Sequence, residues 1–334
     1  KEEIIDGVKI ISLKTPKNRI VRMTKTLLEC YRKAVKIDAD LYHFHDPELI
    51  FVGWLLKKKG KKVIYDVHED VSKDIINKYW IWKPVRILVA KITGYIEKSI
   101  SLKLDGIITA TSSISQNFKY VSEKLIVINN YALINELYQE NKIKPEGRFS
   151  GHFVVYVGSI TVERGAKEML EAMDLLPQDC QVKLLLGGNF VPPLLKETLE
   201  RMQGWRRVDY MGWLDRNQIA SVFRKTQVGL VLFHPEPNHI EAQPNKLFEY
   251  MSAGLPVIAS HFPLWKEIVE GNRCGLTINP LNPQEIADAI RYIFENPNEA
   301  EEMGQRGREA VETKYNWLKE EKKLLAFYEL ILNT

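Results

Sequence analysis

The sequence predicts an α/β protein with two Rossmann-like domains, each built on a doubly wound parallel sheet. Short apolar strands alternate with amphipathic helices along the chain, which is typical of parallel sheets. The alternation stops over residues 129–150, where the sequence becomes polar, and it restarts at His152. A chain of 334 residues is long enough for two domains of ordinary size. We therefore expect a first domain over 1–147, a second over 148–314, and a hinge region between them.

In the first domain, apolar runs of strand length occupy 8–13, 41–45, 62–67, 105–110 and 125–128. Apolar residues recur at helical spacing over 20–34 and over 75–102. Asp46 followed by Pro47 is typical of a helix start, and Gly60 is typical of its end. His45 and His68 then fall at the carboxyl ends of strands, where parallel sheets bind ligands.

In the second domain, strands are expected over 153–157, 182–186, 208–211, 228–233, 255–259 and 275–278. Helices are expected over 167–176, 219–225, 283–295 and 298–313. The tail over 315–334 is amphipathic, and we expect it to form a helix that packs back on the first domain.

The stretch from Pro235 to Pro256 links a strand to a helix and points to a phosphorylated ligand. Its helix begins near Pro244, carries Lys246 and Glu249, and is ended by Gly254. A helix N-terminus presents free N–H groups and a positive dipole end, which favour a phosphate. Lys246 would add a positive charge, and Glu249 could accept hydrogen bonds from a vicinal diol such as a ribose.

Residues 245–260, NKLFEYMSAGLPVIAS, resemble the signature of the retaining glycosyltransferases of family 4 (group 1), which have the GT-B fold. HFHDPEL at 43–49 and YDVHED at 65–70 are similar to further segments of that family. The resemblance implies two Rossmann-like domains facing a central cleft, with the donor nucleotide on the C-terminal domain and the acceptor on the N-terminal one. It also implies that the first domain lacks its opening elements, because no Gly-rich loop precedes Ile20.

The same resemblance implies a set of roles. Glu249 is expected to hold the nucleotide ribose, and Glu241, in a Glu-x7-Glu spacing with it, to lie beside the donor sugar. We expect His68 and Glu241 to be the catalytic residues, and His45 and Asp46 to shape the acceptor side. The expected donor-binding residues are Gly158, Ser159, Arg164, Gly187, Gly212, Trp213, Lys246, Leu247 and Glu249.

Six of these residues have a structural alternative. Glu241, Lys246 and Glu249 are alternatively solvated charges of an amphipathic helix. His68 is alternatively a histidine packed at a domain interface. Asp46 is alternatively a helix N-cap, and Trp213 a packing residue.

His43 and His45 lie two residues apart on one predicted strand and so point to the same face, which is a possible geometry for a pair of metal ligands. No further Cys or His stands at ligand spacing, and the resembling family needs no metal. We therefore expect no metal and no other cofactor, with a nucleotide-diphosphate sugar, UDP- or GDP-linked, as the donor substrate.

Composition narrows the possible partners. Hydrophobic residues make up 45% of the chain and charged residues 27%, which predicts a folded, soluble protein. A net charge of +4 is too small to indicate nucleic-acid binding. The sequence shows no apolar run of membrane-spanning length and no signal peptide, and three widely spaced cysteines fit a reducing compartment. We expect a cytoplasmic protein, and the lysine-rich run at 57–62 is either a solvated helix end or a patch for anionic lipid at the inner face of the cell membrane.

The sequence as a whole predicts a metal-independent hexosyl- or glycosyltransferase. It would move a sugar from a nucleotide-diphosphate sugar to a glycan or lipid-linked acceptor in cell-surface polysaccharide biosynthesis. The alternatives are a sugar-nucleotide epimerase or phosphorylase of the same fold, or a non-catalytic partner subunit that binds nucleotide sugar. Incubation with donor alone separates the first alternative, because an epimerase converts the donor without an acceptor.

Overall fold

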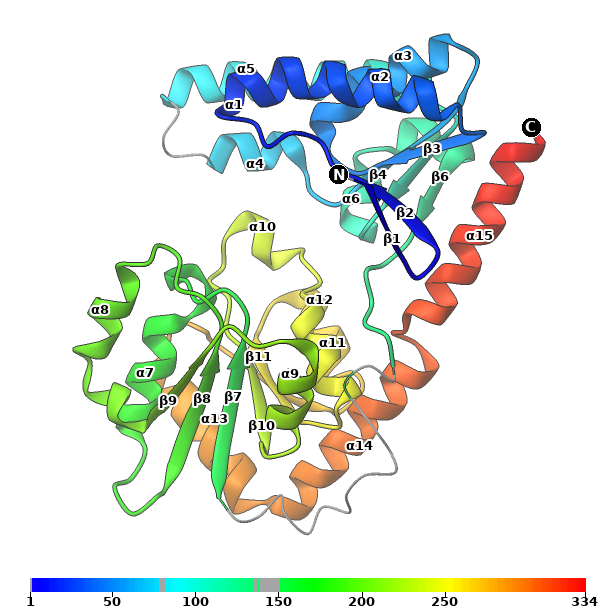
Figure 1. The fold of residues 1–334 in the computed structure, drawn as a ribbon. Coiled ribbons are helices and arrows are strands. Elements are labelled where there is room, and N and C mark those ends of the chain that lie inside the picture. Colours follow the sequence, from blue (N-terminus) through cyan, green and yellow to red (C-terminus); the bar gives the residue numbers. More distant parts are fainter. Residues whose placement is uncertain (1, 78–81, 135–136, 138–150) are drawn as a thin grey trace. The chain divides into compact units, whose positions relative to one another are not determined.

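The computed structural model describes residues 2–77, 82–134, 137 and 151–334, and most of the expected hinge region therefore lies outside the described residues. The chain forms two compact units, one made of 1–129 with 322–334 and the other of 130–321. Each unit contains a parallel sheet flanked by helices (Figure 1). The expected α/β class with two parallel sheets is confirmed.

The first unit contains β1 (Glu2–Ile5), β2 (Val8–Ile11), α1 (Arg19–Val21), α2 (Leu27–Ile37), β3 (Leu41–Phe44), α3 (Ile50–Lys58), β4 (Lys62–Val67), α4 (Val71–Asn77), α5 (Lys83–Ser101), β5 (Gly106–Thr109), α6 (Ser112–Gln116), β6 (Leu125–Val127) and, from Lys322 on, α15 (Trp317–Asn333). Strands β3, β4, β5 and β6 are parallel and follow one another in chain order. This order forms one arm of a doubly wound sheet.

Helices cover both faces of this four-stranded sheet. The core with α3 and α5 includes Val63, Tyr65 and Ile107, which alternate along their strands toward one face. On the other face Phe327 of α15 is buried, and its ring lies against Gly106 of β5. No helix among the described residues has both the length and the apolar character needed to cross a membrane.

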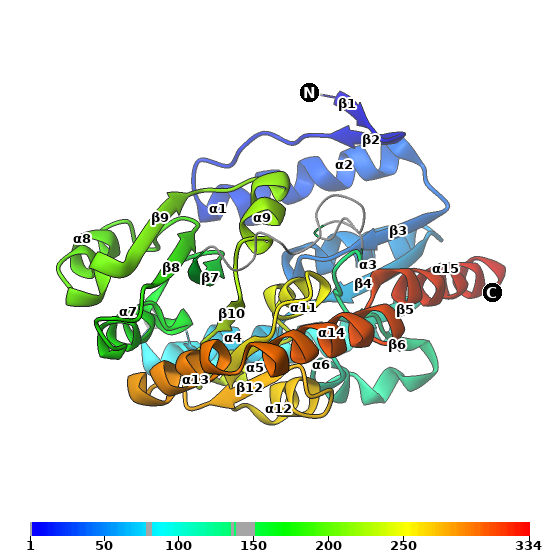
Figure 2. The same ribbon diagram turned by 90° about the horizontal axis from the view of Figure 1, so that it is seen from below.

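The strand expected over 8–13 does not join the parallel sheet. It pairs instead with β1 as an antiparallel hairpin, with Ile5 opposite Val8. Asp6 and Gly7 both have positive φ, the geometry of a two-residue turn that suits Asp-Gly. Figure 2 shows the chain after β2 running beside α2, where Lys33 Nζ donates a hydrogen bond to the Ser12 carbonyl at 3.0 Å. The sequence analysis missed β1 because a strand of four residues is too short to show the alternation of apolar and polar residues that indicates a strand.

The second unit contains β7 (His152–Val157), α7 (Ala166–Leu175), β8 (Val182–Gly187), α8 (Leu195–Glu200), β9 (Val208–Gly212), α9 (Arg216–Phe223), β10 (Val228–Val231), α10 (Pro237–Ile240), α11 (Asn245–Ser252), β11 (Val257–Ser260), α12 (Pro263–Val269), β12 (Gly275–Ile278), α13 (Pro283–Glu295), α14 (Pro297–Thr313) and the start of α15. Its parallel strands are ordered β12-β11-β10-β7-β8-β9. The chain therefore builds outward from β7 in one direction and from β10 in the other, which is a doubly wound sheet with its switch point between these two strands.

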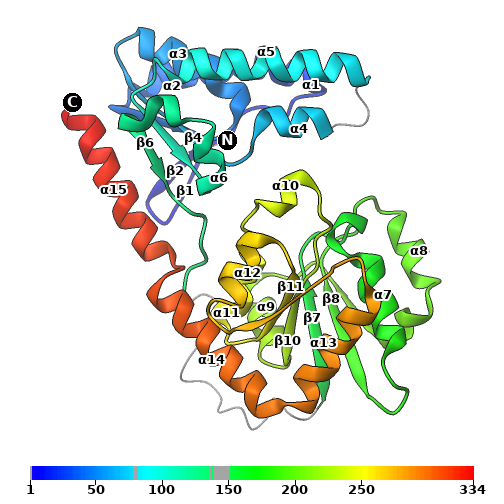
Figure 3. The ribbon, with the colours of Figure 1, turned by 180° about the vertical axis from the view of Figure 1, so that it is seen from behind.

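The two faces of this sheet have separate cores. One core includes residues of α7 and α13, and the other includes residues of α9, α11 and α12. Figures 1 and 3 show these two sets of helices on opposite sides of the sheet. Gly254 ends α11 with φ +67, so the chain turns back at once into β11, as its sequence predicts.

Candidate functional site

The switch point of the second unit gathers most of the expected donor-binding residues. Parallel sheets bind ligands at the carboxyl ends of their strands, next to the switch point. Gly158, Ser159 and Arg164 follow β7, and Lys246 and Glu249 lie on α11, the helix that leads from β10 to β11.

Lys246 is the most unusual residue of this site because its ammonium group is buried. The residue is 8% exposed, and Nζ has no hydrogen-bond partner among the described residues. Nζ lies 3.7 Å from the ring centroid of Tyr156 and 5.4 Å from that of Phe233. Burial lowers the pKa of Lys246 well below its usual value, and the positive charge of Arg164 lowers it further. A buried cation that lies over aromatic rings and has no hydrogen-bond acceptor among the described residues is arranged to receive an anion.

Glycines form the floor beside this lysine. Gly158 has φ +140, and a Cβ at this position would lie 2.9 Å from Lys246 Nζ. The Gly158 N–H donates to the Gly187 carbonyl at 3.0 Å, and the Gly188 N–H donates to the Gly212 carbonyl at 2.6 Å. The ends of β7, β8 and β9 are thus joined backbone to backbone, and because these positions carry no side chain a ligand can approach the backbone closely.

Arg164 supplies a second cation on the same aromatic side chain. It ends a 3-10 turn, Val162–Arg164, and Gly165 follows with φ +76. The guanidinium carbon of Arg164 lies 5.3 Å from the ring centroid of Phe233, which Lys246 also borders. Two like charges next to one ring repel each other, and a ligand with two negative charges would relieve that repulsion.

Glu249 lies one turn after Lys246 and has a partner that the sequence reasoning missed. Arg216 Nη1 donates to Glu249 Oε1 at 2.7 Å, and the Glu249 side chain is 16% exposed. Arg216 is the first residue of α9, whose capping box joins Asp215 to Gln218. That capping box was the sequence signal that could have placed Arg216 at the end of β9.

Glu241, Trp213 and Leu247 were also expected at the donor site, and they differ in how far they are exposed. Glu241 is exposed at the end of α10, and the next carbonyl, that of Ala242, accepts a hydrogen bond from Trp265 Nε1 at 2.7 Å. Trp213 is 70% exposed, so it does not serve as a core packing residue. Leu247 is fully buried, and its N–H already donates to the Pro244 carbonyl, which removes one of the free N–H groups expected at this helix start.

In the first unit, three histidines surround one buried carboxylate, and we call this group the histidine cluster (His43, His45, His68 and Asp66). Asp66 Oδ2 lies 3.1 Å from His43 Nε2, 3.1 Å from His45 Nδ1 and 3.3 Å from His68 Nε2. The expected same-face pair on β3 and the expected His68 after β4 therefore meet. Asp66, 7% exposed, is the member that the sequence analysis missed, although it lies on β4 only two residues before His68.

The pKa shifts of Asp66, His68 and His45 within the histidine cluster have different directions and causes. Burial alone would raise the pKa of Asp66, but hydrogen bonds from His43 and His68 hold it below its usual range. The hydrogen bond to Asp66 raises the pKa of His68, whereas burial lowers the pKa of His45. His45 Nδ1 and His68 Nε2 lie 3.0 Å apart, so only one of these nitrogens can donate to the other. His68 is therefore the imidazole that takes up a proton more readily.

Tyr328 of α15 sets the orientation of His43. Its hydroxyl oxygen lies 2.5 Å from His43 Nδ1, while His43 Nε2 faces Asp66. These contacts fit a tautomer in which Tyr328 donates to Nδ1 and the Nε2–H donates to Asp66. Nothing in the spacing of the sequence connects residues 285 positions apart, so this contact was not predictable.

Asp46 does not act as the expected N-cap. The helical turn that follows it, Pro47–Leu49, is a 3-10 turn, and the Asp46 side chain makes no capping hydrogen bond. Its carboxylate lies instead 3.8 Å from Arg22 Nη2. Because Arg22 also bonds Glu48 at 2.8 Å, it holds these side chains together at the edge of the sheet.

The ligand atoms of His43, His45 and Asp66 all lie within 4.8 Å of one another. Imidazole nitrogens and a carboxylate are ligands that Zn²⁺ accepts, so this group could hold a metal ion. The absence of a metal stays a prediction.

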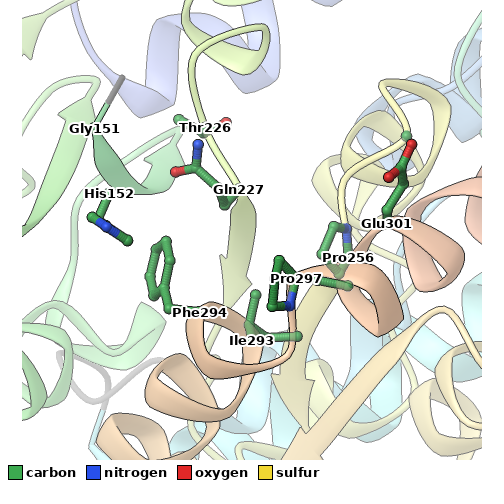
Figure 4. A pocket seen from close by; sticks show the side chains of 11 residues that line it. Gly151, His152, Thr226, Gln227, Pro256, Ile293, Phe294, Pro297 and Glu301 are labelled. Atoms are coloured by element: carbon green, nitrogen blue, oxygen red, sulfur yellow. The ribbon is translucent and has the colours of Figure 1, made fainter. Parts of the chain in front are cut away.

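A cavity of about 250 Å³ lies at the opposite edge of the second unit's sheet, where β7, β10 and β11 begin. Figure 4 shows Phe294, Ile293, Pro297 and Pro256 around it, with Gln227 among the polar side chains. None of the expected site residues lines this cavity.

Comparisons with known proteins relate this geometry to a family. Residues 139–310 match the family described as glycosyl transferases group 1. An uncharacterized glycosyltransferase of Methanocaldococcus jannaschii is 22% identical over 180 residues, which cover 54% of this chain and 45% of that protein. The match to this chain covers less than half the length of each of the first curated relatives.

Solved structures share the fold over nearly the whole chain. Sucrose-phosphate synthase from Thermosynechococcus elongatus has a TM-score of 0.78 at 21% identity, over 99% of this chain and 85% of that one. Anabaena HepE, solved in complex with UDP, has a TM-score of 0.71 at 16% identity, over 94% of this chain and 84% of that one.

Proposed function

Because the chain belongs to the group 1 glycosyl transferases, we propose that it transfers a sugar, with retention of configuration, from a UDP- or GDP-sugar to a glycan or lipid-linked acceptor. The expected setting is cell-surface polysaccharide biosynthesis. The observation that carries the proposal is the pair of cations at the switch point, Lys246 buried and Arg164 beside it, both bordering Phe233.

The diphosphate is the donor group that fits these cations. The glycine ends of β7, β8 and β9 carry no side chains, so the diphosphate oxygens can approach both charges closely. Negative charge develops on the diphosphate as it leaves, and fixed cations away from bulk water stabilise that charge most strongly. The deep burial of Lys246 therefore supports a role for it in the departure of the nucleotide.

Glu249 is the proposed ligand of the ribose. Its Oε1 accepts from Arg216, which leaves Oε2 as an acceptor for a ribose hydroxyl. Arg216 holds the carboxylate in position, so we assign it as a positioning residue. Glu241, exposed at the end of α10, is proposed to lie beside the donor sugar.

The histidine cluster is the proposed acceptor and sugar side, with His68 as the catalytic group. In the retaining reaction the bond from the anomeric carbon to the diphosphate oxygen breaks, and a bond to the acceptor oxygen forms on the same face. The acceptor hydroxyl proton passes to the departing diphosphate. His68, whose pKa Asp66 raises, can donate a hydrogen bond to a sugar or acceptor oxygen during this step.

Peripheral contact with the inner face of the cell membrane belongs to this proposal, but the lysine run at 57–62 supports it only weakly. Lys57 bonds Asp105 at 2.6 Å, and Lys61 bonds Asp38 at 2.6 Å. Lys62 lies 4.0 Å from the same Asp105. Three of the five lysines in this run are therefore paired with two carboxylates of the same unit.

Calorimetric titration with UDP and GDP tests the donor site. Glu249→Ala and Arg164→Ala should each weaken binding of the preferred nucleotide about 10- to 150-fold, the effect of losing one charge-assisted hydrogen bond. Glu197→Ala and Arg201→Ala, which change exposed charges of the same types on and after α8, are the matched controls. Unchanged affinity in the two site variants would remove both residues from the donor site.

A second measurement tests the reaction itself. Conversion of the donor without acceptor to an epimer would contradict transfer, whereas slow release of nucleotide with formation of free sugar supports it. Binding without either reaction would indicate a non-catalytic subunit.

A further inference from the structure

Helices α3 and α5 of the first unit leave large apolar side chains exposed to solvent. On α5, Leu88 is 59% exposed, Ile92 51% and Tyr95 74%. On α3, which contacts α5, Phe51 is 46% exposed and Leu55 37%. Contiguous exposed apolar surface on a folded unit marks a docking site.

The exposed apolar residues of α5 lie along one stripe. Val85, Leu88, Ile92 and Tyr95 are spaced three, four and three residues apart, which is the spacing of one helix face. The opposite face of α5 already packs into the unit, where Ala90 is buried. The stripe is therefore not needed for the core.

The surface of these two helices exposes positive charge and no carboxylate. Neither the segment 50–60 nor the segment 83–96 contains Asp or Glu. Glu97, the first acidic residue after them, faces inward, where it accepts a hydrogen bond from the Tyr65 hydroxyl at 2.8 Å. Burial raises the pKa of Glu97 to about 7, which reduces its negative charge further. The exposed lysines of the two helices and the turn after α3 are Lys58, Lys59, Lys91 and Lys98.

From these observations we propose that the α3–α5 surface docks on an anionic lipid bilayer, with the stripe of α5 lying in the plane of the interface. The apolar side chains would enter the boundary between headgroups and acyl chains, and the lysines beside them would reach lipid phosphates. Trp82, 74% exposed, directly precedes α5, and Tyr95 lies in the second half of this helix. Trp and Tyr are enriched at membrane interfaces. A carboxylate-free surface favours an anionic bilayer over a protein partner, whose interfaces are usually of mixed charge.

Vesicle co-sedimentation of the whole chain tests this proposal, with phosphatidylcholine vesicles compared with equal mixtures of phosphatidylcholine and phosphatidylglycerol. The protein should pellet with the mixed vesicles and much less with the neutral ones, and added salt should release it. Leu88→Ser combined with Ile92→Ser should lower the partition at least about tenfold. Lys91→Glu, which changes two units of charge, should lower it about 30-fold.

Matched controls come from the second unit. Leu175→Ser combined with Leu194→Ser removes two leucines that are 50% and 71% exposed, and Lys225→Glu reverses the charge of an exposed lysine. These variants should pellet as the unchanged protein does. Circular dichroism melting curves of all variants check that each chain folds.

Three outcomes would overturn the proposal. These are equal sedimentation with neutral and anionic vesicles, α5 variants that bind as tightly as the controls, or a dimer in size-exclusion chromatography that the α5 variants dissociate. The last outcome would assign the stripe to a second copy of the chain. Nucleotide titrations on the same variants separate this result from the donor proposal, because the α5 changes should leave UDP or GDP affinity unchanged.

Discussion

Replacing Lys246 with methionine should strengthen the fold and weaken nucleotide binding at the same time. The substitution keeps the length of the side chain and removes its charge. In the free protein the ammonium is buried without a hydrogen-bond partner among the described residues, a state that costs several kcal/mol. Its contact with the Tyr156 ring at 3.7 Å returns about 2 kcal/mol. We therefore expect Lys246→Met to raise the free energy of unfolding by about 1–3 kcal/mol, which raises Tm by about 2–4 °C for each kcal/mol.

The same substitution should lower nucleotide-diphosphate affinity about 10- to 150-fold, because one charge-assisted contact is lost. Differential scanning calorimetry measures the first effect and isothermal titration the second. Lys196→Met is the matched control, since Lys196 also lies over an aromatic ring, that of Tyr210 at 5.2 Å, but its side chain is partly exposed on α8. A variant of Lys246 that is less stable and binds nucleotide normally would refute the reasoning, because the lysine would then be a structural cation.

The pH dependence of this lysine has a definite sign. Its pKa is lowered in the folded state, so the folded chain binds fewer protons than the unfolded chain between the folded pKa and the usual value of about 10.4. The destabilisation by the buried charge is complete below the folded pKa and disappears as pH rises toward the unfolded value. The stability gain of Lys246→Met should therefore be larger at neutral pH than at alkaline pH. Diphosphate binding restores the charge, so it should take up a proton above the folded pKa and weaken there.

Three further predictions concern other parts of the chain. Asp66→Asn should lower the pKa of His68, which proton NMR titration measures, and an unchanged His68 pKa would contradict the contact. The raised His68 pKa stabilises the fold below the unfolded pKa of His, and the lowered Asp66 pKa stabilises it above the unfolded pKa of Asp. The variant should therefore be destabilised most between about pH 4 and 6.5, where both contributions are present. Gly188→Ala should prevent normal folding of the second unit, because its Cβ would collide with the Gly158 carbonyl, whereas Gly60→Ala, also at positive φ but in open space, should cost only about 1–2 kcal/mol in chemical denaturation. Treatment with a chelator should leave transfer activity unchanged, and a loss that Zn²⁺ restores would instead make the histidine cluster a metal site.

The parts of the fold that sequence predicts are those in which local pattern and tertiary structure agree. The strand ends at Val157 and Val67 and the left-handed Gly254 all follow from apolar runs and turn residues. The β1–β2 hairpin was missed because strands of four residues that are mostly exposed show no alternation of buried and exposed side chains. Asp46 was assigned a capping bond from its type alone, and the nearby Arg22 competes for that carboxylate.

The candidate site, like the fold, has residues that the sequence predicts and contacts that it does not. Position after a strand, together with the resemblance to the group 1 glycosyltransferases, indicated Lys246, Glu249 and His68 as site residues. The contacts that give them their properties were not predictable, because they depend on distant side chains. The Lys246 ammonium lies over the ring of Tyr156, which stands ninety positions earlier in the sequence, and no spacing rule connects the two residues.

The contact between Tyr328 and His43 limits how the protein can be dissected. The first unit is not a continuous piece of polypeptide, since Phe327 and Tyr328 reach it from the far side of the second unit's sequence. Translation must therefore pass through the whole of the second unit before the His43 imidazole can contact the Tyr328 hydroxyl. Expressing 1–129 by itself would leave Gly106 uncovered and that imidazole without a fixed tautomer, and a detached peptide carrying α15 would be needed to restore both.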